Sequence, residues 1–126
     1  MKVLQCSKAL KGAGMPSNLS FVQTPVFSIL LDEAGEIGLL DAIEEEITKN
    51  PEGGALLKGG VRKIRVASTE RPEGKSGGYR VWFYHHKPSN VLLLFLLDKR
   101  EAEDLTRAQE LILAKVARDE FGGEKR

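Results

Sequence analysis

Val91-Leu92-Leu93-Leu94-Phe95-Leu96-Leu97 is the longest unbroken apolar run in the chain, and its placement decides the fold. Its 7 residues are far fewer than the ~20 that a helix needs to cross a bilayer. A short apolar run that follows turn residues is typical of a strand covered on both faces. We therefore expect this run to form the central strand of a sheet.

The segment that begins at Val61 alternates between apolar and charged side chains, as a half-buried strand does. Ile64 and Val66 fall on one face, and Lys63 and Arg65 fall on the other. The alternation therefore predicts a strand with one apolar face and one cationic face.

A second alternating segment runs from Tyr79 to about His86 and ends at the turn residues Lys87-Pro88-Ser89-Asn90. Val81 and Phe83 share one face of it. The opposite face carries basic and aromatic side chains, namely Arg80, Trp82, Tyr84 and His86. We expect these two segments and the central strand to form an antiparallel meander.

A short strand and two helices are expected before the meander. Leu19 to Gln23 forms the strand, and Thr24-Pro25 then provides an N-cap and a proline suited to the first position of a helix to about Ala34. The second helix ends at Asn50-Pro51. Its apolar stripe recurs at steps of three and four residues, with Ile37, Leu40, Ile43 and Ile47.

A third helix is expected near the end of the chain, where Thr106 and Gln109 form a capping-box pattern and Gly122-Gly123 ends the helix. Its expected apolar stripe consists of Leu105, Ala108, Ile112 and Val116. The chain is thus predicted to be an α+β domain over residues 19–121, after a flexible leader or extension (1–18) and before a tail (122–126). Its order is β-α-α-β-β-β-α, with a small antiparallel sheet, two N-terminal helices and a C-terminal helix.

The composition of the chain excludes several classes of protein. A chain of 126 residues with 41% hydrophobic residues and a net charge of +1 supports one folded domain and excludes a polycation. The single cysteine, Cys6, cannot form an internal disulfide, and no Cys/His spacing fits a zinc site. With no export signal visible, we expect a cytoplasmic protein with no metal, no cofactor and no contact with a membrane.

Charge is distributed unevenly along the chain. Residues 30–52 contain eight acidic residues and one lysine, whereas residues 58–100 contain ten basic and three acidic residues. Cations on neighbouring strands can converge on a polyanion, although many such residues only solvate a sheet face. Trp82 and Tyr84 share the basic face, and aromatic rings can stack on unpaired bases. The combination favours RNA as the ligand.

Three motifs lie along the basic half of the chain. They are Gly59-Gly60-Val61-Arg62-Lys63-Ile64-Arg65, then Gly74-Lys75-Ser76-Gly77-Gly78-Tyr79-Arg80-Val81, then Asp98-Lys99-Arg100 with Asp104-Leu105-Thr106. Together they resemble the RelE/HigB toxin superfamily, most closely the HigB-like branch of bacterial type II toxin–antitoxin systems. The resemblance covers roughly residues 21–118, and two basic strands at this spacing are more specific than one.

The resemblance implies a RelE-like fold and a toxin that cuts mRNA in the A site of the ribosome and so inhibits translation. Its partners would be the ribosome, mRNA and a cognate antitoxin, usually a helix-turn-helix protein, that keeps it inactive. The implied chemistry needs no metal, because the RNA 2′-hydroxyl attacks the adjacent phosphate. Cations then stabilise the phosphorane, while other side chains transfer protons.

The resemblance also implies site residues. The catalytic set consists of the cations Lys63, Arg65, Arg80 and Arg100 and the candidate proton carriers Tyr84 and His86. Arg80 is the strongest candidate, because its guanidinium suits a phosphate and it follows a Gly-Gly turn. Lys63 would act as a base if neighbouring cations lowered its pKa. The expected RNA-binding set consists of Lys58, Arg62, Lys75, Trp82 and Lys99.

Two other interpretations stay open. Some relatives have a tyrosine near the end of the last strand, where this chain has Leu97, and others have one near the C-terminus. This chain has a tyrosine at neither position, which favours a noncatalytic member that binds RNA, the ribosome or an antitoxin without cutting. The third interpretation is a small interaction domain whose basic face binds an acidic protein.

Overall fold

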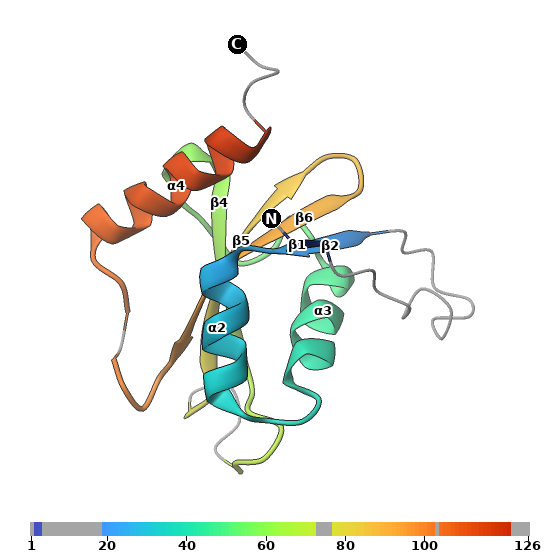
Figure 1. Ribbon diagram of the computed structural model, residues 1–126, viewed down its shortest axis with the longest axis vertical. Helices are drawn as coiled ribbons and strands as arrows, with labels where there is room; N and C mark the ends of the chain where they lie inside the picture. The colour runs from blue at the N-terminus through green and yellow to red at the C-terminus, as the bar shows by residue number, and fades with distance from the viewer. Residues whose placement is uncertain (1, 4–18, 73–76, 103, 122–126) are drawn as a thin grey trace.

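The computed structural model describes residues 2–3, 19–72, 77–102 and 104–121, and within them it confirms the expected α+β class (Figure 1). The elements in chain order are β1 (Lys2–Val3), β2 (Ser20–Gln23), α2 (Pro25–Ala34), α3 (Leu39–Lys49), β3 (Ala55–Leu56), the 3₁₀ turn η1 (Lys58–Gly60), β4 (Val61–Val66), β5 (Tyr79–His86), β6 (Asn90–Asp98) and α4 (Arg107–Phe121).

The strands form one sheet in the order β1-β2-β6-β5-β4-β3. β4, β5 and β6 pair as the expected antiparallel meander. β2, however, runs parallel to β6, with Phe21 beside Val91, so the expectation of an antiparallel sheet is wrong and the sheet is mixed. The reason is the long connection through α2, α3 and the first strands of the meander, which returns the chain to the sheet in its original direction.

β6 is buried on both faces, as the apolar run predicted. Val91, Leu93 and Leu96 face one core cluster, while Leu92 and Leu94 face the other. A register shift between Trp82 and Phe83 of β5 leaves Leu94 as an extra residue in β6. The two clusters require a covering layer on each side of the sheet.

α2 and α3 provide the first layer (Figure 1). α2 begins as expected, because the Thr24 hydroxyl accepts the Phe27 N–H at 3.0 Å and donates to the Leu94 carbonyl at 3.1 Å. In α3, Ile43 and Ile47 are fully buried, but Ile37 is 88% exposed and was wrongly placed in the stripe. The helix starts only after Gly38, whose φ of 86° leaves Ile37 in the preceding turn.

α4 provides the second layer and begins with the expected capping box. The Thr106 N–H donates to the Gln109 side chain at 2.8 Å, and the Gln109 N–H donates to the Thr106 hydroxyl at 3.1 Å. The buried residues of α4 are Leu113, Ala114 and Ala117.

The apolar stripe expected in α4 is wrong. Ile112 is 60% exposed and Val116 is 36% exposed, Ala108 is also exposed, and only Leu105 packs partly against the core. Small residues decide which face of α4 is buried, because they allow the helix to approach η1 closely. A Cβ at Gly59 would lie 2.7 Å from the Cβ of Ala114.

The expected leader and tail lie mostly outside the described residues. Within residues 1–18, Lys2 and Val3 pair antiparallel with Gln23 and Val22 of β2. Residues 4–18 with Cys6, and residues 122–126 with Gly122-Gly123, are outside the described ranges.

The double burial of β6 predicts a large difference between two leucine truncations. Leu93→Ala removes a fully buried side chain and should lower the free energy of unfolding by about 2–5 kcal/mol. Leu56→Ala, at a side chain that is 61% exposed, should change it by less than about 0.5 kcal/mol. Urea unfolding followed by circular dichroism measures both, and equal effects would contradict the assignment of β6 as the central strand.

Candidate nucleic-acid interface

Three cations from β4 and β5 occupy the sheet face that α4 partly covers. Lys63 and Arg65 share this face of β4, and Arg80 is the direct cross-strand partner of Arg65. Arg65 is exposed and makes no ion pair with any described residue, while Arg80 is half-buried. Like charges directly opposite each other destabilise a sheet. The arginine pair is therefore a costly arrangement unless an anion lies beside it.

Lys63 is enclosed by carboxylates. Its Nζ atom donates to both Asp104 oxygens, at 3.0 and 2.8 Å, and to Oε2 of Glu110 at 3.1 Å. Burial alone would lower the pKa of Lys63, but the hydrogen bonds and charges of Asp104 and Glu110 outweigh it and raise the pKa above 10.5. The expectation that neighbouring cations make Lys63 a general base is therefore wrong, because its closest charged neighbours are anions.

Asp104 links Lys63 electrostatically to Arg80. Burial would raise the pKa of Asp104, but hydrogen bonds from Lys63 and the Leu105 N–H, with the charges of Lys63 and Arg80, hold it below 3.8. Asp104 is consequently an anion at neutral pH. Lys63, Arg80 and Asp104 behave as one charged group.

Trp82 lies beneath this group and is fully buried. Its Nε1–H donates to Oε2 of Glu110 at 3.0 Å, and its ring meets Phe95 edge-on, with 5.9 Å between the centroids. The Nζ atom of Lys63 lies 5.7 Å from the ring centroid. The expectation that Trp82 stacks on an RNA base is wrong, because α4 covers the face on which the indole lies.

Tyr84 and His86 belong to an aromatic stack with Phe121 at the end of α4. The ring centroids are 5.8 Å apart for Tyr84 and Phe121 and 4.2 Å apart for His86 and Phe121. Tyr84 lies four residues beyond Arg80 on β5, about 13 Å along an extended strand. The structure therefore separates the expected proton carriers from the arginine pair.

The other expected RNA-binding residues lie in different places. Arg62 shares the face of Ile64, on the α2 and α3 side, where its guanidinium is 3.2 Å from the Glu52 carboxylate. Lys58 is exposed in η1, and Lys99 follows β6, where its backbone N–H donates to the Gly78 carbonyl at 3.0 Å. Lys75 lies outside the described residues. Among the described members of this set, Trp82 alone has a side chain in contact with Lys63.

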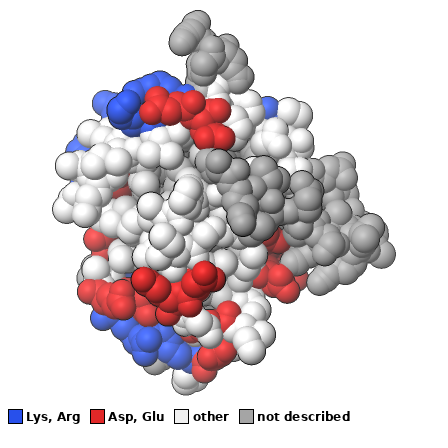
Figure 2. Space-filling view, in the orientation of Figure 1, with Lys and Arg blue, Asp and Glu red and all other residues white. Residues whose placement is uncertain are grey.

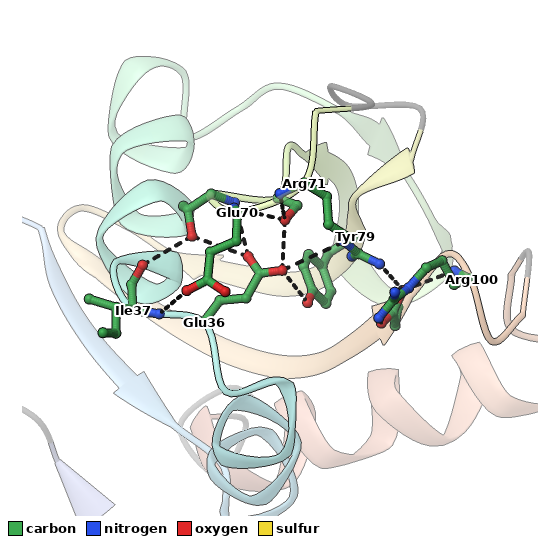
Figure 3. Close-up of polar contacts among 9 residues, drawn as sticks. Glu36, Ile37, Glu70, Arg71, Tyr79 and Arg100 are labelled. Atoms are coloured by element: carbon green, nitrogen blue, oxygen red, sulfur yellow. Dashed lines mark hydrogen bonds and ion pairs between the residues drawn. The ribbon is translucent and has the colours of Figure 1, made fainter.

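Arg100 belongs to a second polar cluster (Figure 3). Its guanidinium is 3.3 Å from Asp98, which also pairs with Arg71 at 3.3 Å. Asp98 is the cross-strand partner of Tyr79, which packs in the core cluster under α2 and α3. The structure therefore ties Arg100 to the opposite side of the sheet from Arg80.

Glu36 is the centre of this second cluster, and sequence reasoning missed its role by counting it as part of an acidic surface. Its carboxylate accepts the Ser68 hydroxyl at 2.6 Å, the Thr69 N–H at 2.9 Å and the Tyr79 hydroxyl at 2.9 Å. Burial would raise the pKa of Glu36, but these hydrogen bonds outweigh it and hold the pKa below 4.5. Burial, followed in size by the hydrogen bond to Glu36, raises the pKa of the Tyr79 hydroxyl to about 12.

Arg71 completes the cluster and gives it a structural role. Its guanidinium lies 5.0 Å above the Tyr79 ring, and its Nε atom is 3.7 Å from Glu36. Its Nε and Nη2 atoms have no hydrogen-bond partner among the described residues, a cost that the ring beneath partly offsets. The cluster ties the turn between α2 and α3 to the connection between β4 and β5.

Five cations of the basic half take part in local ion pairs. The pairs are Arg62 with Glu52, Lys63 with Asp104 and Glu110, Arg71 with Glu36 and Asp98, Lys87 with Glu52, and Arg100 with Asp98. Figure 2 shows separate acidic and basic patches near the upper and lower ends of this view, with mainly uncharged surface between them. The excess of cations in the sequence therefore overstates the basic surface.

No protein-family model matches the chain. In the described ranges, no helix combines the length and apolar character needed to cross a membrane. Those ranges also contain no group of three or more His, Cys, Asp or Glu side chains placed to hold a metal ion.

The Glu36 cluster predicts a pH-dependent contribution to stability. Because the pKa of Glu36 is below 4.5 in the folded protein, its ionised form stabilises the fold above pH 4.5, and this is lost as pH falls through the folded pKa. Glu36→Gln should therefore lower the free energy of unfolding by about 1–3 kcal/mol at neutral pH, with a smaller difference from wild type in acid. Urea unfolding across pH measures this, with exposed Glu33→Gln as control. A difference that does not change with pH would contradict the role of the charge.

Proposed function

We propose that this protein is the toxin of a type II toxin–antitoxin system, a ribosome-dependent mRNA endoribonuclease in which Arg65 and Arg80 bind the scissile phosphate. The observation that carries the proposal is the direct pairing of these arginines across β4 and β5, with the Arg65 side chain exposed. Both residues lie within the motifs that resemble the HigB-like toxins. An RNA phosphate would bind the exposed guanidinium of Arg65 and offset the like charge of the pairing.

The arginine pair suits the charge that develops during RNA cleavage. The 2′-oxygen bonds to phosphorus and the bond from phosphorus to the 5′-oxygen breaks, which leaves a 2′,3′-cyclic phosphate and a 5′-hydroxyl. The 2′-hydroxyl proton goes to a base, and the leaving 5′-oxygen takes up a proton. Two guanidinium groups at the phosphate stabilise the additional charge of the phosphorane between these steps.

The same proposal includes a RelE-like fold, a cytoplasmic location and a cognate helix-turn-helix antitoxin. The long elements β2, α2, α3, β4, β5, β6 and α4 follow one another in an order compatible with that fold. The ribosome and its mRNA would then face the end of the sheet that carries Arg65 and Arg80, while the antitoxin covers another surface.

A noncatalytic function is the second candidate, and one observation favours it. Tyr84 and His86, the side chains expected to transfer protons, stack with Phe121 and lie far along β5 from Arg80. A protein whose phosphate-binding pair has neither of these two side chains beside it would bind RNA or the ribosome without cutting. Translation arrest without cleavage would distinguish this function from the nuclease.

Arg80→Ala tests the catalytic role directly. Loss of one group that stabilises the transition state should reduce cleavage by about 10²–10³-fold while the domain stays folded. Primer extension on a reporter mRNA in a reconstituted bacterial translation reaction, with and without ribosomes, measures the cuts. Arg118→Ala removes an exposed arginine from α4 and should leave them unchanged. Equal cleavage by the wild type and Arg80→Ala would reject the assignment.

Arg65→Ala separates a functional role from a structural one. If the arginine pair exists to bind phosphate, removing Arg65 relieves like-charge repulsion and should leave the free energy of unfolding unchanged or raise it by about 0.2–1 kcal/mol. The same variant should weaken RNA binding. A clear loss of stability in thermal unfolding would instead show that Arg65 supports the fold.

A further inference from the structure

We propose that Asp104 and Glu110 form a carboxylate clamp that occupies Lys63 in the free protein and competes with RNA for it. The inference rests on the proposed function, because it takes the arginine pair as the place where RNA phosphates bind. The clamp then sets how tightly RNA is held, since Lys63 reaches the RNA only after the clamp opens.

The clamp uses the full donor capacity of Lys63. An ammonium group has three N–H donors, and the Nζ atom has three carboxylate oxygens within 3.1 Å, two from Asp104 and one from Glu110. The Lys63 side chain is only 14% exposed. A phosphate oxygen can therefore bind Lys63 only by replacing a carboxylate oxygen, so RNA and the clamp exclude each other at this atom.

The two carboxylates differ in how firmly they are held. Glu110 is fixed within α4, is 16% exposed and also accepts the Trp82 indole N–H at 3.0 Å. Asp104 belongs to the connection between β6 and α4, and its side chain is 40% exposed. Asp104 is therefore the carboxylate that moves, and Glu110 is the one that stays.

The energies allow this exchange. An ion pair with a partly exposed carboxylate contributes little, because solvent screens it. An RNA strand gains more than this, because each phosphate contact releases a bound counterion. Lys63 lies two residues from Arg65 on the same face, about 7 Å along the strand. Once released, it adds a third cation to the arginine pair.

The chain contains its own reporter for this exchange. Trp82 is the single tryptophan of the sequence. Glu110 accepts its N–H, and the Lys63 ammonium lies 5.7 Å from its ring centroid. Movement of the Lys63 ammonium changes the electric field at the indole. Binding of RNA should therefore shift the emission of Trp82 without any base touching the ring.

The test compares Asp104→Asn with a variant that removes the same charge elsewhere. Asparagine keeps an oxygen for the Leu105 N–H, which Asp104 accepts at 2.8 Å, so the start of α4 is preserved. The control is Asp119→Asn, at an exposed residue of α4 that pairs with Lys115 at 3.5 Å. Affinity is measured as the anisotropy of a short labelled single-stranded RNA of mixed sequence, and thermal unfolding verifies that both variants fold.

We expect Asp104→Asn to bind the RNA about three- to five-fold more tightly than Asp119→Asn, the effect of removing an ion pair of up to about 1 kcal/mol. Equal affinities of the two variants would overturn the clamp, because the gain would then reflect net charge alone. An unchanged Trp82 emission on saturation of the wild type with RNA would also overturn it.

The outcomes separate the clamp from the proposed function. Saturable RNA binding that Arg65→Ala weakens, with no difference between the two aspartate variants, rejects the clamp and leaves the arginine site intact. RNA binding by Asp104→Asn alone supports both, since the wild type would then be closed. Absence of RNA binding by the wild type and by Asp104→Asn rejects the clamp, while the proposed function is judged separately by the effect of Arg80→Ala on cleavage in the presence of ribosomes.

Discussion

The structure depends on the burial of β6 on both of its faces. A strand with apolar residues at successive positions cannot expose either face to water, so the sheet requires a layer of helix on each side. α2 and α3 form one layer and α4 forms the other. The second layer determines the candidate site, because α4 covers Trp82 and leaves Arg65 exposed. The need to cover the second face of β6 thus determines which part of the cationic face is exposed to solvent.

A structural feature could be predicted from the sequence when neighbouring residues, and not distant contacts, determine it. The cap at Thr24, the capping box of Thr106 with Gln109 and the central position of β6 depend on neighbouring residues or on one apolar run, and all three are confirmed. The buried face of α4 depends on distant contacts. The buried face contains the small residue Ala114, which packs against Gly59, and not the larger apolar residues of the expected stripe.

The candidate site was predictable in its cations but not in their partners. Strand alternation placed Lys63, Arg65 and Arg80 on one face, and the register of β4 with β5 agrees. Alternation carries no information about Asp104, which reaches Lys63 from 41 residues away in the sequence. It also does not indicate that Trp82 lies beneath a helix, or that Glu36 is enclosed by residues of a later connection. Charge counted along the sequence therefore predicted a more open basic surface than the fold provides.

Self-repulsion explains why the carboxylates and the arginine pair belong to one arrangement. Three cations on two adjacent strands repel one another, and in the absence of a ligand that repulsion opposes folding. Asp104 and Glu110 neutralise Lys63, while Arg65 remains in solvent, where repulsion is screened. An anionic ligand can supply the same neutralisation from outside. Carboxylates of the protein and an external anion are thus two alternative ways to balance these charges, and the exposed end of the group is at Arg65.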